Sequence, residues 1–326
     1  MIKSNLQPSS LDTLLAKEFP PNRWLVNGLI PLHGITILHG LPTAGKTWLM
    51  MEIAISVAQG KLLFNQFETN HTGVLLLDEE SGEWLLHDRF KTLRAPSELP
   101  IHYLTMNSSK FTESYVDELI EWCTDNKVGF ITIDSLVRIH GGDENTAQDS
   151  AKVFRLIRKL TSAGITVLII HHNTKASANG EYGSQMRGSG DIQASVDCQL
   201  SLVRPYRDDY LTLEQVKNRY APEMPTIELN FMKHDDYSEF IYLGQLKEGA
   251  KHAELKPIIL QVIGADPGIS QNGLHEKLME LGHGIHVKTL RKLLGTMEGE
   301  SIDKTKGKAN AYCYFIKPKE TEPSES

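Results

Sequence analysis

The sequence predicts an α/β fold with a mainly parallel sheet, followed by a small, mostly helical unit. Apolar segments of strand length alternate with helical segments through most of the chain, as in β-α-β units. The first of these strands, residues 34–40, runs into a glycine-rich loop and the apolar helix 47–60. From Leu255 the pattern changes to three short helices and a hairpin. We therefore expect a core domain at residues 1–248, a second domain at 249–318 and a disordered tail at 319–326.

The glycine-rich loop has the spacing GxxxxGK[ST], from Gly40 to Thr47. Its glycines let backbone N–H groups turn toward phosphate oxygens, Lys46 can reach the β- and γ-phosphates, and the Thr47 hydroxyl can hold Mg²⁺ at a helix N-terminus. The strand before the loop and the helix after it are the context that a P-loop needs, which weighs against a chance glycine-rich turn. The expected ATP-binding residues are Gly40, Leu41, Pro42, Thr43, Ala44, Gly45, Lys46, Thr47 and Trp48.

Two further strands end on acidic residues. The strand at residues 73–78 is followed by Glu79 and Glu80, and the strand at 128–136 carries Asp134 near its end. Ligands of open parallel sheets bind at the carboxyl ends of the strands, so these acids can face a γ-phosphate and Mg²⁺. Asp134 has the position of a Walker B carboxylate, which secures the metal beside a P-loop. For the first pair of acids, the alternative is a solvated acidic loop.

The next strand, residues 164–175, carries His171 and His172 near its end. A polar side chain there would lie close to the phosphates and could sense them. The segment at residues 173–191 has too many Gly, Ser and Asn residues to pack, so it is either functional or disordered. Four later segments predict an antiparallel extension of the sheet, at residues 198–204, 210–220, 226–231 and 239–244.

Composition and charge are those of a globular protein without a membrane span. Hydrophobic residues make up 40% and charged residues 23% of the chain, and no run of about eighteen apolar residues occurs. The three cysteines lie far apart and the N-terminus lacks the apolar core of a signal peptide, which favours a reducing cytoplasm. A net charge of −7 argues against a polycation that coats nucleic acid. Residues 251–319, however, hold 11 Lys and Arg against 7 Asp and Glu, a net of +4.

The second domain has the pattern of a winged helix, with a recognition helix at residues 286–298 and a hairpin wing after it. Val287, Leu290, Leu294 and Met297 share one face of that helix and would pack inward. The opposite face and the tip of the wing would contact DNA phosphates; the alternative is a winged helix used only for protein contacts. The candidate DNA contacts are Lys288, Thr289, Arg291, Lys292, Lys304, Lys306 and Lys308.

Taken together, these motifs resemble the RecA-fold ATPases of the hexameric helicase type, especially the small plasmid-borne RepA-like helicases. The resemblance covers about residues 11–244, and beyond the P-loop it is carried by three segments: DEES at 78–81, IDSL at 133–136 and IHGGDEN at 139–145. It implies that Mg²⁺-ATP binds between the subunits of a homo-oligomeric ring, with a hexamer favoured. It also implies that single-stranded DNA passes through the channel of this ring.

The resemblance assigns roles to individual residues as well. It implies that Glu79 is the catalytic glutamate, with Glu80 as the second candidate, and that His172 reads the γ-phosphate. Arg89 resembles a residue that packs on the adenine. The segment MRGSGDIQASVD, residues 186–197, is similar to the part of DnaB-type helicases around the channel loop. In and beside this segment the candidate DNA contacts are Lys175 and Arg187.

A last resemblance concerns VKNRY, residues 216–220, which is similar to a KxR stretch that projects into the neighbouring subunit's site. It implies that Lys217 and Arg219 act in trans as fingers on the ATP of the next subunit. In an extended segment the two side chains lie on the same side. The alternative is that they form ordinary surface pairs with nearby acids, which would matter little.

We therefore expect an ATP-dependent DNA-binding motor, with helicase work in plasmid, phage or integrated-element replication as the first hypothesis. The rival is an ATP-switched DNA-binding regulator or loader, in which ATP only controls assembly. A recombinase filament is a third hypothesis, weakened by the lack of an evident N-terminal polymerisation segment. We also expect two departures from the family pattern: no primase-recruiting N-terminal domain is expected, and the winged helix is not part of the minimal plasmid helicase.

Overall fold

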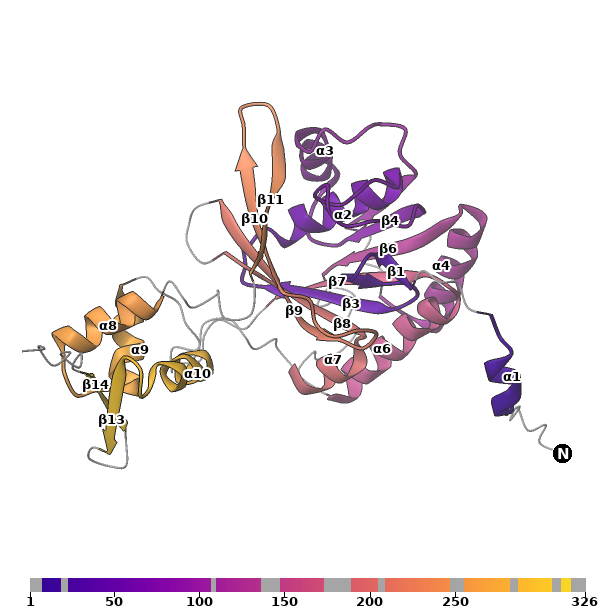
Figure 1. The fold of residues 1–326 in the computed structure, drawn as a ribbon. Coiled ribbons are helices and arrows are strands. Elements are labelled where there is room, and N and C mark those ends of the chain that lie inside the picture. Colours follow the sequence, from indigo (N-terminus) through magenta and orange to yellow (C-terminus); the bar gives the residue numbers. More distant parts are fainter. Residues whose placement is uncertain are drawn as a thin grey trace, which may run out of the picture.

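A nine-stranded sheet forms the centre of the computed structural model (Figure 1), with the order β11-β10-β9-β8-β3-β7-β6-β4-β5. The structure describes residues 8–18, 23–106, 110–135, 147–172, 189–204, 209–246, 255–281, 287–306 and 312–317. The parallel strands are β3 (Ile35–Gly40), β4 (Gly73–Asp78), β5 (Ile101–Thr105), β6 (Val128–Asp134), β7 (Thr166–His172) and β8 (Cys198–Val203). The antiparallel extension consists of β9 (Tyr210–Asn218), β10 (Thr226–Lys233) and β11 (Ser238–Leu246). The predicted α/β fold with a mainly parallel sheet is confirmed.

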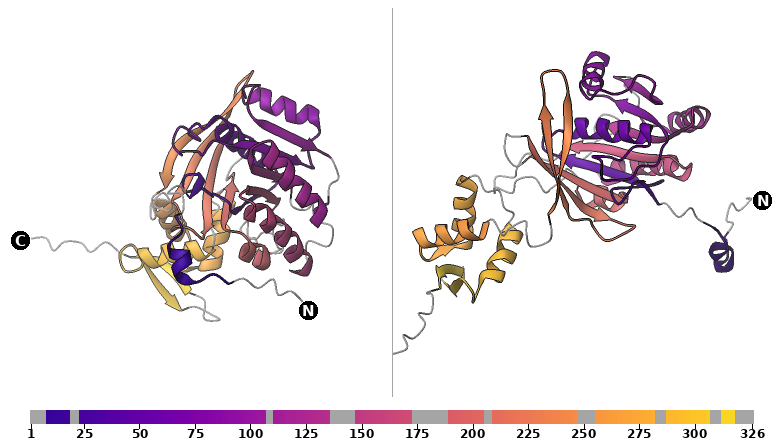
Figure 2. Two further views of the ribbon diagram at one scale, coloured as in Figure 1. Left: turned by 90° about the vertical axis from the view of Figure 1, so that its right-hand side faces the viewer. Right: turned by 45° about the horizontal axis from the view of Figure 1, so that its top comes forward.

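Helices cover both faces of the sheet (Figure 2), because alternate residues of each buried strand point to opposite sides. On one face, α2 (Lys46–Gln59) and α3 (Glu83–Thr92) pack over a core that includes Leu38 and Ile170. On the other face, α4 (Glu113–Asp125), α6 (Ala147–Ser162) and α7 (Ser189–Ser195) pack over Ile37 and Ile169. The predicted unpacked segment, residues 173–191, was wrong at its end, because helix α7 begins at Ser189. Ile192 of this helix is buried in the core.

The N-terminal segment packs on the core only in part. Strands β1 (Trp24–Val26) and β2 (Ile30–Pro31) pair with each other, and their apolar residues are buried in the same cluster as α2. Helix α1 (Leu11–Leu15), by contrast, has no buried residue. Among the described residues, every helix is too short or too polar to span a lipid bilayer.

Residues 255–317 contain a second unit with its own core, built from the elements α8 (Leu255–Ala265), β12 (Ile269–Ser270), α9 (Gln271–Glu280), α10 (Val287–Met297), β13 (Ile302–Lys306) and β14 (Tyr312–Ile316). Its three strands are ordered β12-β14-β13. Helix α9 has a side-chain N-cap, since the Ser270 hydroxyl accepts a hydrogen bond from the Gly273 N–H at 3.1 Å. Leu290, Leu294 and Met297 are buried as the helical pattern predicted.

Candidate nucleotide-binding site

The P-loop joins β3, in the middle of the sheet, to the start of α2. Strand β3 lies between β7 and β8, and the loop leaves its carboxyl end. Two positions in the loop require glycine. A Cβ on Gly40 would lie 2.3 Å from the Leu202 carbonyl oxygen, and Gly45 has a φ of +97°, which side chains rarely tolerate. Helix α2 therefore begins directly at Lys46, with its first N–H groups open to an anion.

The ammonium of Lys46 is folded back onto this loop. Its Nζ donates hydrogen bonds to the carbonyl oxygens of Gly40 at 3.1 Å and Leu41 at 2.9 Å. Burial lowers the pKa of Lys46, and the nearby carboxylates of Asp134 and Glu80 oppose that shift. A cation held by neutral carbonyls in a buried place is poised to exchange them for phosphate oxygens, which carry full charge.

The Thr47 hydroxyl meets Asp134, although these two residues are far apart in the sequence. Thr47 Oγ1 donates a hydrogen bond to Asp134 Oδ2 at 2.7 Å. Burial raises the pKa of Asp134 to about 6, while the Thr47 hydrogen bond and His172 act in the opposite direction. A hydroxyl and a carboxylate side by side are oxygen ligands of the kind that Mg²⁺ prefers, and the phosphates of a substrate would supply the rest. The residues present therefore fit Mg²⁺ bound together with a nucleotide.

The acids after β4 are arranged by a turn at the end of the strand. Asp78 Oδ1 accepts hydrogen bonds from the N–H groups of Glu80 at 2.9 Å and Ser81 at 2.7 Å. This turn directs Glu80 toward β6 and β7. Its Oε1 accepts a hydrogen bond from Ser135 Oγ at 2.7 Å and lies 3.4 Å from His172 Nε2.

The Glu80 side chain reaches Ser135 and His172, and the choice between Glu79, which the sequence placed first, and Glu80 stays a prediction. The Glu79 backbone N–H donates to the carbonyl oxygen of Asp134 at 2.7 Å. The Glu80 side chain instead contacts His172, the proposed γ-phosphate sensor, and its charge acts on both Lys46 and Asp134. Ser135 joins the same group, a contact that nothing in the motif pattern indicated.

Arg89 and Trp48 lie together beside the start of α2. The Arg89 guanidinium stands 5.8 Å from the centroid of the Trp48 ring, and its NH1 donates a hydrogen bond to Ser81 Oγ at 2.9 Å. Trp48, on α2, also packs against Phe231 of β10, with 5.2 Å between the two ring centroids. A flat cation and an indole next to a P-loop are suitable contacts for a purine base, and this role stays a prediction.

Lys217 and Arg219 lie near the amino ends of the parallel strands, whereas the P-loop lies at their carboxyl ends. Strand β9 runs antiparallel to β8, so Asn218 stands opposite Cys198, which in turn pairs with Thr36 at the start of β3. The P-loop leaves β3 four residues later, which corresponds to about 13 Å of strand. Neither cation therefore approaches the phosphate site of its own chain.

The proposed DNA contacts are only partly in the described residues. Lys175, Arg187 and Lys308 lie outside them, as do the side chains of Lys288, Thr289 and Lys292 on α10. Arg291 is exposed, with its Nε 3.4 Å from Gln271 Oε1. Lys306 is exposed too, whereas Lys304 forms an ion pair with Glu298 at 2.5 Å and has its ammonium 4.9 Å from the Tyr312 ring.

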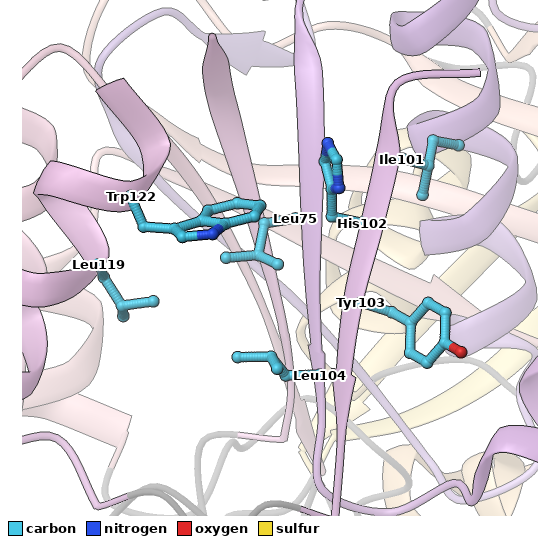
Figure 3. A pocket seen from close by; sticks show the side chains of 7 residues that line it. All are labelled: Leu75, Ile101, His102, Tyr103, Leu104, Leu119 and Trp122. Atoms are coloured by element: carbon cyan, nitrogen blue, oxygen red, sulfur yellow. The ribbon is translucent and has the colours of Figure 1, made fainter. Parts of the chain in front are cut away.

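A separate pocket of about 430 Å³ lies at the β5 edge of the sheet, remote from the P-loop strand (Figure 3). Leu119 and Trp122 of α4 face Leu75 and Leu104 there, and the Trp122 ring meets His102 edge-on at 5.0 Å. The lining is mostly apolar and holds no phosphate-binding group, so this pocket is not part of the nucleotide site.

Fold and site together define a P-loop ATPase: a mainly parallel sheet with the phosphate loop on the central strand β3, and with carboxylates at the end of β6 and just after β4. A family described as AAA domain matches residues 3–178, more than half of the chain, and the protein belongs to this family. The match supports nucleotide binding and ATPase activity. No curated protein matches the chain.

Proposed function

We propose that this protein is an ATP-dependent DNA-binding motor of the RepA-like helicase type, which hydrolyses Mg²⁺-ATP at the interfaces of a ring, with six subunits favoured. The observation that carries the shared-site proposal is the separation of Lys217 and Arg219 from the P-loop of their own chain. The two cations are separated from the P-loop of their own chain by about 13 Å along the strand direction, so they cannot complete the site of that chain. In a ring they can instead contact the nucleotide bound by the neighbouring subunit.

In this proposal Glu80 orients the attacking water. Its contacts with Ser135 and His172 fix the carboxylate at the end of β4, and His172 can respond to the phosphate that departs. Lys46 binds the β- and γ-phosphates, and Thr47 and Asp134 hold the metal. Bound Mg²⁺ would neutralise phosphate charge, which is the main demand of phosphoryl transfer along with positioning.

We expect Glu80→Gln to keep ATP binding and to lose hydrolysis by roughly 10²- to 10⁴-fold, because the amide preserves shape but cannot accept the proton of water. Glu79→Gln is the matched control, one residue away with the same change. Binding of a fluorescent ATP analogue and phosphate release are to be measured on both proteins. If Glu79→Gln is the damaged variant and Glu80→Gln is not, the sequence's first choice was right.

We further propose that residues 255–317 form a winged helix that binds duplex DNA. The order helix, strand, two helices, two strands suits that fold, and α10 has the place of a recognition helix. Arg291 and Lys306 are exposed there, and residues 251–319, which include this unit, carry a net charge of +4. The proposal makes no use of Lys304, since Glu298 already neutralises it.

In the full chain, Arg291→Glu combined with Lys306→Glu is expected to weaken duplex binding and to flatten its dependence on salt. Each phosphate contact contributes about 0.9 to the slope of log affinity against log salt, so two lost contacts lower that slope by about 2. Lys61→Glu is the control, since Lys61 is exposed and lies in the core domain just beyond the C-terminal end of α2. A salt slope that is unchanged in the double variant would favour a role in protein contacts.

The rival function is an ATP-switched DNA-binding regulator or loader. Both hypotheses require ATP and DNA, but only a motor separates strands. A forked duplex with a labelled strand distinguishes them: displacement that depends on ATP hydrolysis supports the motor, and its absence in a protein that binds DNA and hydrolyses ATP supports the regulator.

A further inference from the structure

A buried carboxylate at the amino-terminal edge of the sheet joins several elements. Asp197 lies just before β8, and its side chain is only 3% exposed. Asp197 Oδ2 accepts a hydrogen bond from the Ile35 N–H at 2.9 Å, at the start of the P-loop strand. The Asp197 backbone bridges the same elements, since its N–H donates to the Ile35 carbonyl and its own carbonyl accepts from the Arg219 N–H. This residue therefore ties β3 to the end of β9.

Two arginines share this carboxylate. Arg158, on α6, donates from NH1 to Asp197 Oδ2 at 2.5 Å and from NH2 to Asp197 Oδ1 at 3.0 Å, the two-pronged geometry that a guanidinium favours. Arg219 NH1 donates to Asp197 Oδ1 at 3.0 Å. Arg158 bonds both oxygens of the Asp197 carboxylate and so fixes its orientation. Arg219 meets the carboxylate in that fixed orientation.

The same cations close the C-terminus of α7. Arg158 NH2 donates to the Ser195 carbonyl oxygen at 2.8 Å, and Arg219 NH2 donates to that of Ala194 at 3.0 Å. Lys217 Nζ reaches the carbonyl oxygens of Gln193 at 2.5 Å and Val196 at 2.8 Å. Unpaired carbonyls and the negative end of the helix dipole attract cations at this place.

Two arginines thus contact one carboxylate and Lys217 lies beside them, which leaves an excess of positive charge at the amino ends of the parallel strands. Arg219 remains 52% exposed, and its two bonds use two of the five N–H groups of a guanidinium. Burial and the nearby charges of Arg219 and Arg158 lower the pKa of Lys217, whereas Asp197 opposes the shift. The Arg219 guanidinium can therefore bind a phosphate of a second molecule through its remaining N–H groups and keep its hydrogen bonds to Asp197 and Ala194.

We propose that Arg158 and Asp197 are positioning residues for ATP hydrolysis: they hold Arg219 in the orientation in which it meets the nucleotide of the neighbouring subunit. This inference rests on the proposed trans role of Arg219. Arg158 does not touch the nucleotide in this arrangement, since its NH1 and NH2 groups face Asp197 and Ser195. Its effect passes through the carboxylate.

The test is Arg158→Lys, which keeps the positive charge and loses the paired contact. A small displacement of a catalytic group costs about 10²-fold in rate, so we expect kcat to fall by roughly that factor while KM changes less than about twofold. Arg155→Lys is the matched control on the same helix; Arg155 is 73% exposed and bonds only Glu113 among the contacts described. Asp197→Asn is a second variant if Arg158→Lys does not fold.

Mixing of inactive subunits separates a positioning role from a merely structural one. Arg158→Lys protein should regain activity when it is mixed with Lys46→Ala, because the Lys46→Ala chain brings an intact finger to an intact P-loop. It should stay inactive with Arg219→Ala, since both chains then lack a working finger. Recovery with Arg219→Ala, or a normal rate for Arg158→Lys alone, would overturn the inference.

The same experiment keeps the two proposals apart. If Arg219→Ala and Lys46→Ala fail to restore each other although their subunits exchange, the shared site itself is wrong. If that pair recovers but Arg158→Lys does not behave like a finger variant, only the positioning role of Arg158 and Asp197 fails.

Discussion

Lys46→Ala is expected to reduce ATP hydrolysis by at least about 10²-fold while the protein stays folded. Among the contacts described, the Lys46 ammonium bonds to the Gly40 and Leu41 carbonyls, and Lys46 belongs to neither hydrophobic core cluster of the sheet, so its removal leaves those clusters intact. What is lost is a preorganised charge that would meet phosphate oxygens in a buried place, and groups of that kind contribute 10² to 10³ in rate when removed singly. Phosphate release by the purified variant is the measurement.

The control is Lys61→Ala, which removes an exposed lysine just beyond the C-terminal end of α2. Thermal unfolding of both variants should stay close to that of the unchanged protein. Ordinary turnover by Lys46→Ala would contradict the assignment of the nucleotide site, whatever the DNA-binding results.

The layers of the fold could be predicted because the strands are continuous apolar runs that alternate with helices. Such runs arise when both faces of a sheet are covered, and the two core clusters on either side of β3 confirm it. Helix α7 could not be predicted, because SGDIQAS has little apolar content and poor helix propensity. Ile192 in the core and the cations at its C-terminus stabilise it instead, and these are tertiary contacts.

The nucleotide site divides in the same way. Residues fixed by local spacing, such as Gly45, Lys46 and Thr47, were placed by the motif, and the contact of Thr47 with Asp134 agrees with it. The choice between Glu79 and Glu80 depends on a turn at the end of β4, which two hydrogen bonds to Asp78 set. A shift of one residue in such a turn changes which side chain faces the site. The hydrophobic pattern of the sequence does not indicate such a shift.

Asp197 illustrates a harder case. In the sequence it is one acid in a polar segment, and Arg158 is one cation among several on an amphipathic helix. Their pairing across 39 positions becomes visible only when α6, β8 and β9 are brought together. The sequence indicated Lys217 and Arg219 through their resemblance to trans-acting residues, but it gave no signal for what holds them.

The contacts of Arg219 within one chain indicate how much its removal should affect the fold of the subunit. Arg219 is half exposed, and its buried partner Asp197 stays paired with Arg158 when Arg219 is removed, so no unpaired charge is left in the interior. Its removal should therefore leave the fold of the subunit largely unchanged, while Asp197 keeps the paired contact from Arg158. An effect on hydrolysis would then reflect a role outside the chain that carries the residue.

Arg219→Ala is expected to lower ATP hydrolysis by roughly 10³- to 10⁵-fold, the range over which an arginine finger acts in related phosphate chemistry. ATP binding should persist, because the P-loop lies at the far edge of the sheet and keeps all its contacts. The decisive measurement is the activity of Arg219→Ala and Lys46→Ala proteins mixed after subunit exchange, each being inactive alone. In a mixed ring the intact P-loop of the first protein faces the intact finger of the second, so part of the activity should return. If Arg219→Ala hydrolyses ATP normally as a monomer, the finger role is excluded and these cations only hold α7 in place.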